Sequence, residues 1–242
     1  MTEFKYPRRD PARALPRDVV LLGLDIGQSP DPSALSVVQR SGRVPATYGV
    51  RWLKRWALGH RYSDVVLEAA HVATDKSLEG LDRYLVIDAT GVGRPVLEMF
   101  DAEGPILKAV AGFAGVSQIA VTITAGFSVT VSKADRGVLL LADEAYNVPR
   151  RDLISTAQVV LQTKRLRIAE GLGRDGEQLL EEFLSLRRRM TDKGETFEPD
   201  SAAGHDDLVL SVALPVWYGE QVLGDVYREE TDGGETQIPL RV

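Results

Sequence analysis

The segment VVLLGLDIG, from Val19 to Gly27, is a continuous apolar run that ends in an aspartate and a glycine. Such a run is typical of a β-strand that is buried on both faces of a sheet. The segment RYLVIDATG, residues 83–91, has the same form and also ends in an aspartate. If the two strands are parallel neighbours, Asp25 and Asp88 lie side by side at the carboxyl edge of the sheet, where open α/β sheets place their sites.

A third segment, GHDDLVLSVALPVWYG at residues 204–219, carries two more carboxylates into a buried run. Asp206 and Asp207 begin a predicted long helix, and ionised carboxylates beside a core segment are costly unless something compensates them. A helix packed on the sheet edge would bring them to the strand-end aspartates, where a cation would offset the repulsion. Oxygen ligands, with no cysteine and few histidines nearby, favour Mg²⁺ or Mn²⁺.

Each of these residues also has a simpler explanation when it is taken alone. Aspartates at strand ends often only form turns, which would account for Asp25 and Asp88 separately. The pair at 206–207 could cap its helix and complement the helix dipole. His205 fits a loop or cap position better than a metal ligand. The joint pattern of two strand ends and one buried helix start favours the metal site.

The surrounding pattern predicts an α/β fold, with a mixed β-sheet flanked by helices. Further strands are expected at 34–42, 46–58, 106–113 and 165–169, with a β-rich stretch at 119–132. Helices are expected at 62–76, with Ser63 as the N-cap, and at 150–163 and 175–189. A polar loop is expected at 191–204. We expect one domain over residues 18–219, a flexible Pro- and Arg-rich arm at 1–17, and an acidic tail at 220–242.

Composition narrows the class of protein. The chain of 242 residues has no cysteine, which excludes disulfides and thiolate zinc sites. The longest apolar run, Leu208 to Tyr218, is too short to span a bilayer, and the N-terminus lacks the hydrophobic segment of a signal peptide. These features predict a cytoplasmic protein with no membrane partner.

The net charge of −6 gives no global support for nucleic-acid binding, which instead needs local positive charge. Basic residues do cluster locally, at 51–61, 150–151, 164–167 and 187–189, and each cluster is either a solvated surface or a DNA contact. The candidate DNA-binding residues are Arg51, Lys54 and Arg55 in the first cluster and Arg187, Arg188 and Arg189 in the last.

The segments GLDIGQSPDPSAL, YLVIDATGVG and GHDDLVLSVAL resemble, in this order, the three acidic motifs of the nuclease domain of bacteriophage large terminases. The segment VPRRDLISTAQVVLQTKRLRIAEGL is also similar to terminase-related phage and prophage sequences. The resemblance covers residues 18–218 and implies a ribonuclease H-like fold.

Carried onto this sequence, the resemblance implies that Asp25, Asp88 and Asp207 are catalytic metal ligands and that Asp206 is an accessory ligand. Neighbouring helical residues point about 100° apart, so both carboxylates cannot aim equally at one ion. Asp207 shares its face with the small Ser211, which leaves room for the sheet edge, and we therefore favour Asp207. Asp31 matches an acidic position in the family's first motif or forms a turn.

The implied activity is metal-dependent endonucleolytic cleavage of concatemeric viral DNA during genome packaging. Two Mg²⁺ or Mn²⁺ ions about 4 Å apart would activate a water and stabilise the leaving oxygen, with Asp25 as the bridging ligand. Lys133 contacts the scissile phosphate or is a surface lysine. The sequence has no GxxxxGK[ST] phosphate loop. The chain is therefore either an excised domain or a partner of a separate packaging ATPase and portal, acting on double-stranded DNA.

Two other classes of function share these motifs. A Holliday-junction resolvase or a ribonuclease H-type hydrolase uses carboxylates on the same fold, and a non-catalytic packaging protein could retain the fold with the carboxylates as caps. The sequence leaves the cut-site preference, the oligomeric state and the physiological metal open.

Overall fold

The computed structural model describes residues 18–27, 31–42, 45–91, 93–131, 142–191, 194–199 and 205–224, with only the backbone described at 93–94, 187–191 and 194–199. The predicted arm at 1–17, residues 225–242 of the predicted tail, and Lys133 lie outside these residues. In the described part of the chain, no helix is long and apolar enough to cross a membrane.

The centre of the described fold is an eight-stranded mixed sheet with the order β6-β7-β5-β4-β1-β2-β3-β8. Its strands are β1 (Asp18–Asp25), β2 (Ala34–Ser41), β3 (Thr47–Arg55), β4 (Asp82–Asp88), β5 (Val116–Thr124), β6 (Thr130–Val131), β7 (Glu144–Pro149) and β8 (Leu166–Ile168). β1, β2 and β3 form an antiparallel meander, whereas β4, β5 and β7 continue the sheet parallel to β1. The expected mixed sheet flanked by helices is confirmed.

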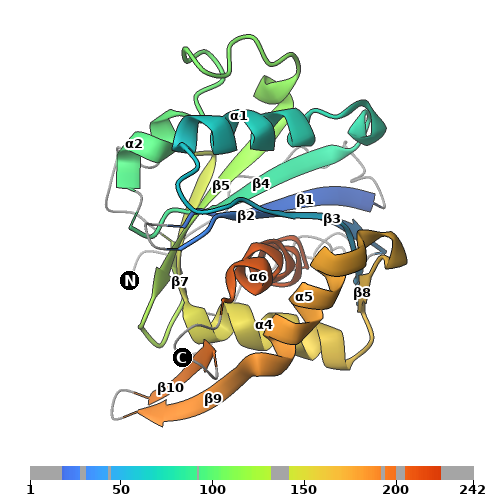
Figure 1. Ribbon diagram of the computed structural model, residues 1–242, viewed down its shortest axis with the longest axis vertical. Coiled ribbons are helices and arrows are strands. Elements are labelled where there is room, and N and C mark those ends of the chain that lie inside the picture. The colour runs from blue at the N-terminus through green and yellow to red at the C-terminus, as the bar shows by residue number, and fades with distance from the viewer. Residues whose placement is uncertain are drawn as a thin grey trace, which may run out of the picture.

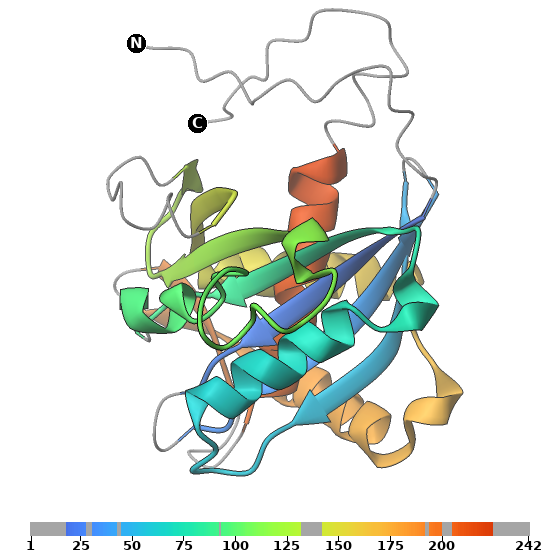
Figure 2. The same cartoon turned by 90° about the horizontal axis from the view of Figure 1, so that it is seen from above.

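Helices cover both faces of this sheet (Figure 1). One face carries α1 (Tyr62–Ala73) and the short α2 (Gly93–Glu98), and the other carries α4 (Arg150–Gln162), α5 (Gly173–Ser185) and α6 (Asp207–Gln221). Short 3₁₀ turns lie at Lys76–Leu78, Phe113–Gly115 and Glu170–Leu172. A separate antiparallel hairpin, β9 (Leu186–Thr191) and β10 (Gly194–Pro199), lies beside α4. Figure 2 shows the sheet from above, with α1 crossing it.

The apolar run of β1 is continuous because the strand is buried on both sides. Val19 and Leu21 belong to the core under α4, α5 and α6, whereas Val20, Leu22 and Leu24 belong to the core under α1. Successive side chains of a strand point to opposite faces, so both sets must be apolar. The same alternation turns Asp25 toward the α6 side of the sheet.

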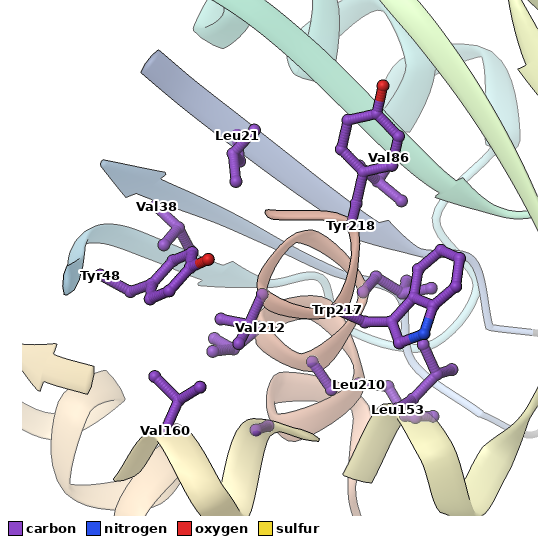
Figure 3. Packing of buried hydrophobic residues seen from close by; sticks show 14 of the residues in the cluster. Leu21, Val38, Tyr48, Val86, Leu153, Val160, Leu210, Val212, Trp217 and Tyr218 are labelled. Carbon is purple, nitrogen blue, oxygen red and sulfur yellow. The ribbon is translucent and has the colours of Figure 1, made fainter. Parts of the chain in front are cut away.

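Helix α6 lies in the first of these cores and is buried along most of its length (Figure 3). It packs closely on β1 at Gly23, where a Cβ atom would lie 1.9 Å from the Ser211 carbonyl oxygen and 2.4 Å from Cδ of Pro215. Pro215 has no N–H to donate within the helix, so the Ser211 carbonyl lacks its usual partner. The Ser36 hydroxyl donates to that carbonyl at 2.7 Å, which ties α6 to β2.

Four expectations about local structure are wrong. Residues 106–113 form turns rather than a strand, and β5 begins only at Val116. The buried residues of that stretch are Leu107, Val110 and Phe113. Their spacing of three suits successive turns, whereas a strand facing one core buries every second residue.

The helix expected at 175–189 is also shorter than predicted. It ends at Ser185, and Arg187, Arg188 and Arg189 lie on β9, opposite residues 196–198 of β10. The predicted polar loop therefore contains a strand. At the start of α1 the N-cap is Arg61, without a side-chain cap, so Ser63 does not have the expected capping role.

Candidate functional site

Asp25 and Asp88 lie next to each other at the carboxyl edge of the sheet. β1 and β4 are parallel neighbours with Leu24 opposite Ile87, and each aspartate is the last residue of its strand. Each residue is only 6% exposed. Burial, followed by the charges of Asp88 and Asp207, raises the pKa of Asp25 well above its usual value, and the charge of Arg150 offsets this only in part.

The Asp88 carboxylate is held by the turn that follows its strand. It accepts a hydrogen bond from the Thr90 backbone N–H at 2.7 Å, and the Thr90 hydroxyl in turn accepts one from the Ile123 N–H at 2.6 Å. Burial raises the pKa of Asp88, while the Thr90 hydrogen bonds and the charge of Arg150 act in the opposite direction. The second strand-end aspartate therefore has a defined orientation but remains short of compensating charge.

Asp207 is the first residue of α6 and is also 6% exposed. Burial raises the pKa of Asp207, and the positive charges of Arg55 and His205 reduce that shift without removing it. Its Oδ2 atom lies 3.4 Å from Nε of Arg55 and 3.5 Å from Nδ1 of His205. Among the described residues, Asp207 Oδ2 and Arg55 Nε are both buried without a hydrogen-bond partner.

The two adjacent aspartates of α6 have different surroundings. Asp206 is the N-cap residue, makes no side-chain cap, and forms an ion pair with Arg150 at the start of α4. Asp207 instead contributes to the electrostatic environment of Asp25. The structure thus brings Asp25, Asp88 and Asp207 together from β1, β4 and α6, with Asp206 directed to an arginine.

Two further predicted residues lie near Asp207. The exposed Asp31 follows β1 in the chain, and its charge raises the pKa of Asp207. His205 is half-exposed, and its ring lies against the Asp207 carboxylate.

The three basic residues of β3 point in different directions. Arg51 is exposed and donates to the Gln39 side chain at 3.0 Å. Lys54 pairs with Glu68 of α1 and lies over the Trp56 ring at 5.3 Å. Arg55 turns to the other face of the sheet, toward α6, where its guanidinium is held between Glu182 and Asp207. This placement favours an internal role for Arg55 over the predicted DNA contact.

Two charged residues of the site were not predicted. In the sequence Arg150 is typical of a surface charge, and its position directly after the carboxyl end of β7 is the signal that could have placed it at the site. Glu182 is 7% exposed and lies on the buried face of α5, together with Leu179 and Phe183. A carboxylate on the apolar face of an amphipathic helix is the sequence signal for such a buried charge.

No family model and no curated protein matches the sequence. Solved structures do resemble the fold. The large terminase nuclease from thermophilic phage G20c is 20% identical, with 84% of this chain and 82% of that chain covered and a TM-score of 0.53. The human cytomegalovirus terminase nuclease domain, soaked with Mn, is 12% identical over 89% of both chains, with a TM-score of 0.55.

The chain has the fold of the terminase nuclease domains. This is the ribonuclease H-like α/β fold that the three acidic motifs imply. A further structure of the G20c nuclease, with bound cobalt, is 22% identical over 82% of this chain and 80% of that chain, with a TM-score of 0.51. Identities at this level establish the shared fold and leave the activity of this chain to its own residues.

The residues present suit a divalent metal ion of the kind those structures contain. Three buried carboxylates supply hard oxygen donors, and Asp207 Oδ2 is buried without a hydrogen-bond partner in the described part of the chain. No three described acidic or histidine side chains form a ready-made metal site. The fit therefore rests on the donor chemistry and on the buried negative charge, which a cation would offset.

Proposed function

We propose that this chain is a metal-dependent DNA endonuclease of the terminase type, which cuts concatemeric viral DNA during genome packaging in the host cytoplasm. The observation that supports this function is the convergence of Asp25, Asp88 and Asp207, from three separate elements, at the carboxyl edge of a terminase-like sheet. Buried carboxylates with raised pKa values are costly to keep together, and catalytic use is a common reason for such a site.

In this proposal each charged residue of the site has a role that follows from its position. Bound in pairs, Mg²⁺ or Mn²⁺ ions supply an activated water and charge stabilisation in phosphodiester hydrolysis. The charges of Asp88 and Asp207 both act on Asp25, which would hold the ions together with these two carboxylates. Asp88 is oriented by Thr90, and Asp207 by its place at the first turn of α6. Arg150 pairs with Asp206, and its positive charge also acts on Asp25 and Asp88.

DNA binding in this proposal is largely independent of sequence and uses basic side chains against phosphates. Arg51 remains a candidate contact from β3, and Arg187, Arg188 and Arg189 remain candidates from β9. Lys133 stays a candidate for the scissile phosphate, and the motor ATPase and portal would be separate partners. Replacing the three β9 arginines with alanine should flatten the dependence of duplex affinity on salt, by about one unit of slope for each phosphate that the variant no longer neutralises.

Plasmid nicking in Mn²⁺, Mg²⁺, Ca²⁺ or EDTA tests the activity. We expect nicking in Mn²⁺ or Mg²⁺, none in EDTA, and DNA binding without cleavage in Ca²⁺, which fills oxygen-rich sites but does not impose octahedral geometry. The Asp25→Asn variant serves as the inactive control. Wild-type protein that leaves the plasmid intact in both Mn²⁺ and Mg²⁺ would contradict the proposal and favour a non-catalytic packaging role.

The same assay separates the related enzymes. Linear duplex, four-way junction and RNA–DNA hybrid are compared at equal concentrations. Preference for the duplex supports the terminase-type activity, whereas preference for the junction or the hybrid indicates a resolvase or a ribonuclease H-type hydrolase.

A further inference from the structure

Arg55 and Asp25 lie in one row across three strands of the sheet. Asp25 is paired with Ala34 of β2, and Ala34 is paired with Arg55 of β3. Directly opposed residues of antiparallel strands project from the same face, so both charged side chains point to the α6 side. The residue between them has only a methyl group, which leaves room at this edge for the first turn of α6.

Glu182 joins three elements at this point through both of its carboxylate oxygens. Oε1 accepts a hydrogen bond from Nη2 of Arg55, the last residue of β3. Oε2 accepts one from the backbone N–H of Val209, in the first turn of α6, at 3.1 Å. An N-terminal N–H of this kind is normally satisfied by the N-cap side chain. Asp206 makes no such bond, so Glu182 of α5 caps α6 in its place.

Arg55 faces Asp207 without satisfying it. The guanidinium is engaged by Glu182 at Nη2, while its Nε stays 3.4 Å from Asp207 Oδ2 with no hydrogen bond formed. Asp207 thereby gains a nearby positive charge and keeps a free lone pair. A direct Arg–carboxylate fork would occupy that lone pair.

We propose that Arg55 and Glu182 are positioning residues for Asp207. Glu182 fixes the start of α6 and holds the Arg55 guanidinium, so that Oδ2 of Asp207 stays unbonded beside Arg55 and can bind a metal ion. This inference rests on the proposed metal-dependent function. Loss of Glu182 frees Arg55 to bond Asp207 directly, which competes with a metal ion for the same oxygen.

The experiment compares Glu182→Gln with Glu220→Gln. The control breaks another largely buried carboxylate–arginine pair, Arg165–Glu220, at the opposite end of α6. Mn²⁺ affinity is measured by calorimetry on the whole chain without DNA, and the melting temperature is measured in EDTA. Removing groups that orient metal ligands typically weakens metal binding by about 10–100-fold. We expect Glu182→Gln to weaken Mn²⁺ binding by at least about 10-fold, and Glu220→Gln to leave it at the wild-type value.

Arg55→Lys provides a second test if Glu182→Gln fails to fold. Lysine keeps the positive charge but lacks the planar fork that reaches Glu182 and Asp207 together. We expect Mn²⁺ binding to weaken in this variant as well. If folded Glu182→Gln and Arg55→Lys bind Mn²⁺ with wild-type affinity but melt at lower temperatures, the two residues have a purely structural role. That outcome overturns this inference and leaves the proposed function standing. Absence of Mn²⁺ binding by the wild type overturns the proposed function and this inference together.

Discussion

Both ends of α6 carry a carboxylate opposite an arginine, buried at the N-terminal end and partly buried at the C-terminal end, and the two carboxylates differ in how many hydrogen bonds they accept. At the C-terminal end, Glu220 accepts hydrogen bonds from Arg165 at 2.8 and 2.9 Å and from the Tyr48 hydroxyl at 2.7 Å. Burial pushes the pKa of Glu220 upward, but the hydrogen bonds outweigh it and the pKa is lowered.

At the N-terminal end of α6 the effect of burial on the carboxylate pKa outweighs that of the neighbouring positive charges. In the described part of the chain, Oδ2 of Asp207 is buried without a hydrogen-bond partner, and burial keeps the pKa of Asp207 raised despite Arg55 and His205. Burial also raises the pKa of Asp25, and the charges of Asp88 and Asp207 raise it further. At the C-terminal end both carboxylate oxygens of Glu220 accept hydrogen bonds, whereas at the N-terminal end Oδ2 of Asp207 has no hydrogen-bond partner among the described residues. Buried ion pairs therefore differ in role according to which atoms remain unpartnered.

The largest expected difference between the ends is in catalysis. Replacing Asp25, Asp88 or Asp207 with asparagine should reduce plasmid nicking by roughly 10³-fold or more, because metal stabilisation of the transition state is worth several kcal/mol. Glu220→Gln should retain nicking near the wild-type rate in protein that is still folded. Comparable losses at the two ends would show that cleavage responds to helix stability rather than to the carboxylate site.

A smaller effect on nicking is expected from Asp206→Asn. Asp206 pairs with Arg150, whose charge also acts on Asp25 and Asp88, so its loss should act indirectly, by about 10-fold. Nicking rates of Asp206→Asn and Asp207→Asn at saturating Mn²⁺ provide the comparison. If Asp206→Asn is the more damaging change, the assignment of the two adjacent aspartates is reversed.

Metal binding should stabilise the N-terminal end by mass action. At Mn²⁺ concentrations about 100 times Kd, the gain is about 2.7 kcal/mol. For a chain of this size that raises the melting temperature by about 5–10 °C. The gain should persist in Glu220→Gln and be lost in Asp25→Asn. An unchanged melting temperature of the wild type in millimolar Mn²⁺ argues against any metal site here.

The smallest effect concerns pH and the metal-free protein. Because the folded pKa of Asp25 lies above its unfolded value of about 3.9, the folded state binds the proton more tightly, and stability falls as pH rises through this window. Asp25→Asn should remove that loss and raise the metal-free melting temperature at pH 7 by about 2–4 °C for each kcal/mol of repulsion relieved.

Glu220 should behave in the opposite way. Its folded pKa is lowered, so its stabilisation is present above the unfolded value of about 4.3 and is lost as pH falls. Melting temperatures in EDTA from pH 4 to pH 8 separate the two cases. A lower melting temperature for Asp25→Asn than for wild type at pH 7 would contradict the expected repulsion.

The parts of the fold that were predictable from sequence are those whose signals are local. The runs of β1 and β4 are long and apolar and end in aspartates, and α6 is a long apolar segment, so their existence and the convergence of their carboxylates could be inferred. Residues 106–113 were wrongly predicted as a strand because their composition suits a strand, although the spacing of their apolar residues does not. The end of α5 was misplaced because Leu186 and the following arginines suit a helix, whereas hairpin pairing with β10 is non-local.

The charged residues around the carboxylates were less predictable for a related reason. Glu182 reaches α6, and Arg150 reaches Asp206, only because α5 and α4 pack against the start of that helix. Arg55 and Lys54 are neighbours in sequence, but they lie on opposite faces of β3 and belong to different cores. Alternation along a strand could have separated them, whereas their partners come from distant parts of the chain.

The close contact of Gly23 with Ser211 and Pro215 also fixes where β1 and α6 lie against each other, and thereby the positions of Asp25 and Asp207. From this contact, Asp25 lies two residues further along β1, about 6.6 Å away at the rise of a strand. Asp207 lies four residues back along α6, about 6 Å away at the rise of a helix. The two aspartates therefore lie at similar distances from this contact. A one-residue insertion between 207 and 211 would carry Asp207 about 100° around the helix and 1.5 Å further along it. Insertions and deletions in either of these two short segments should therefore displace one carboxylate relative to the other.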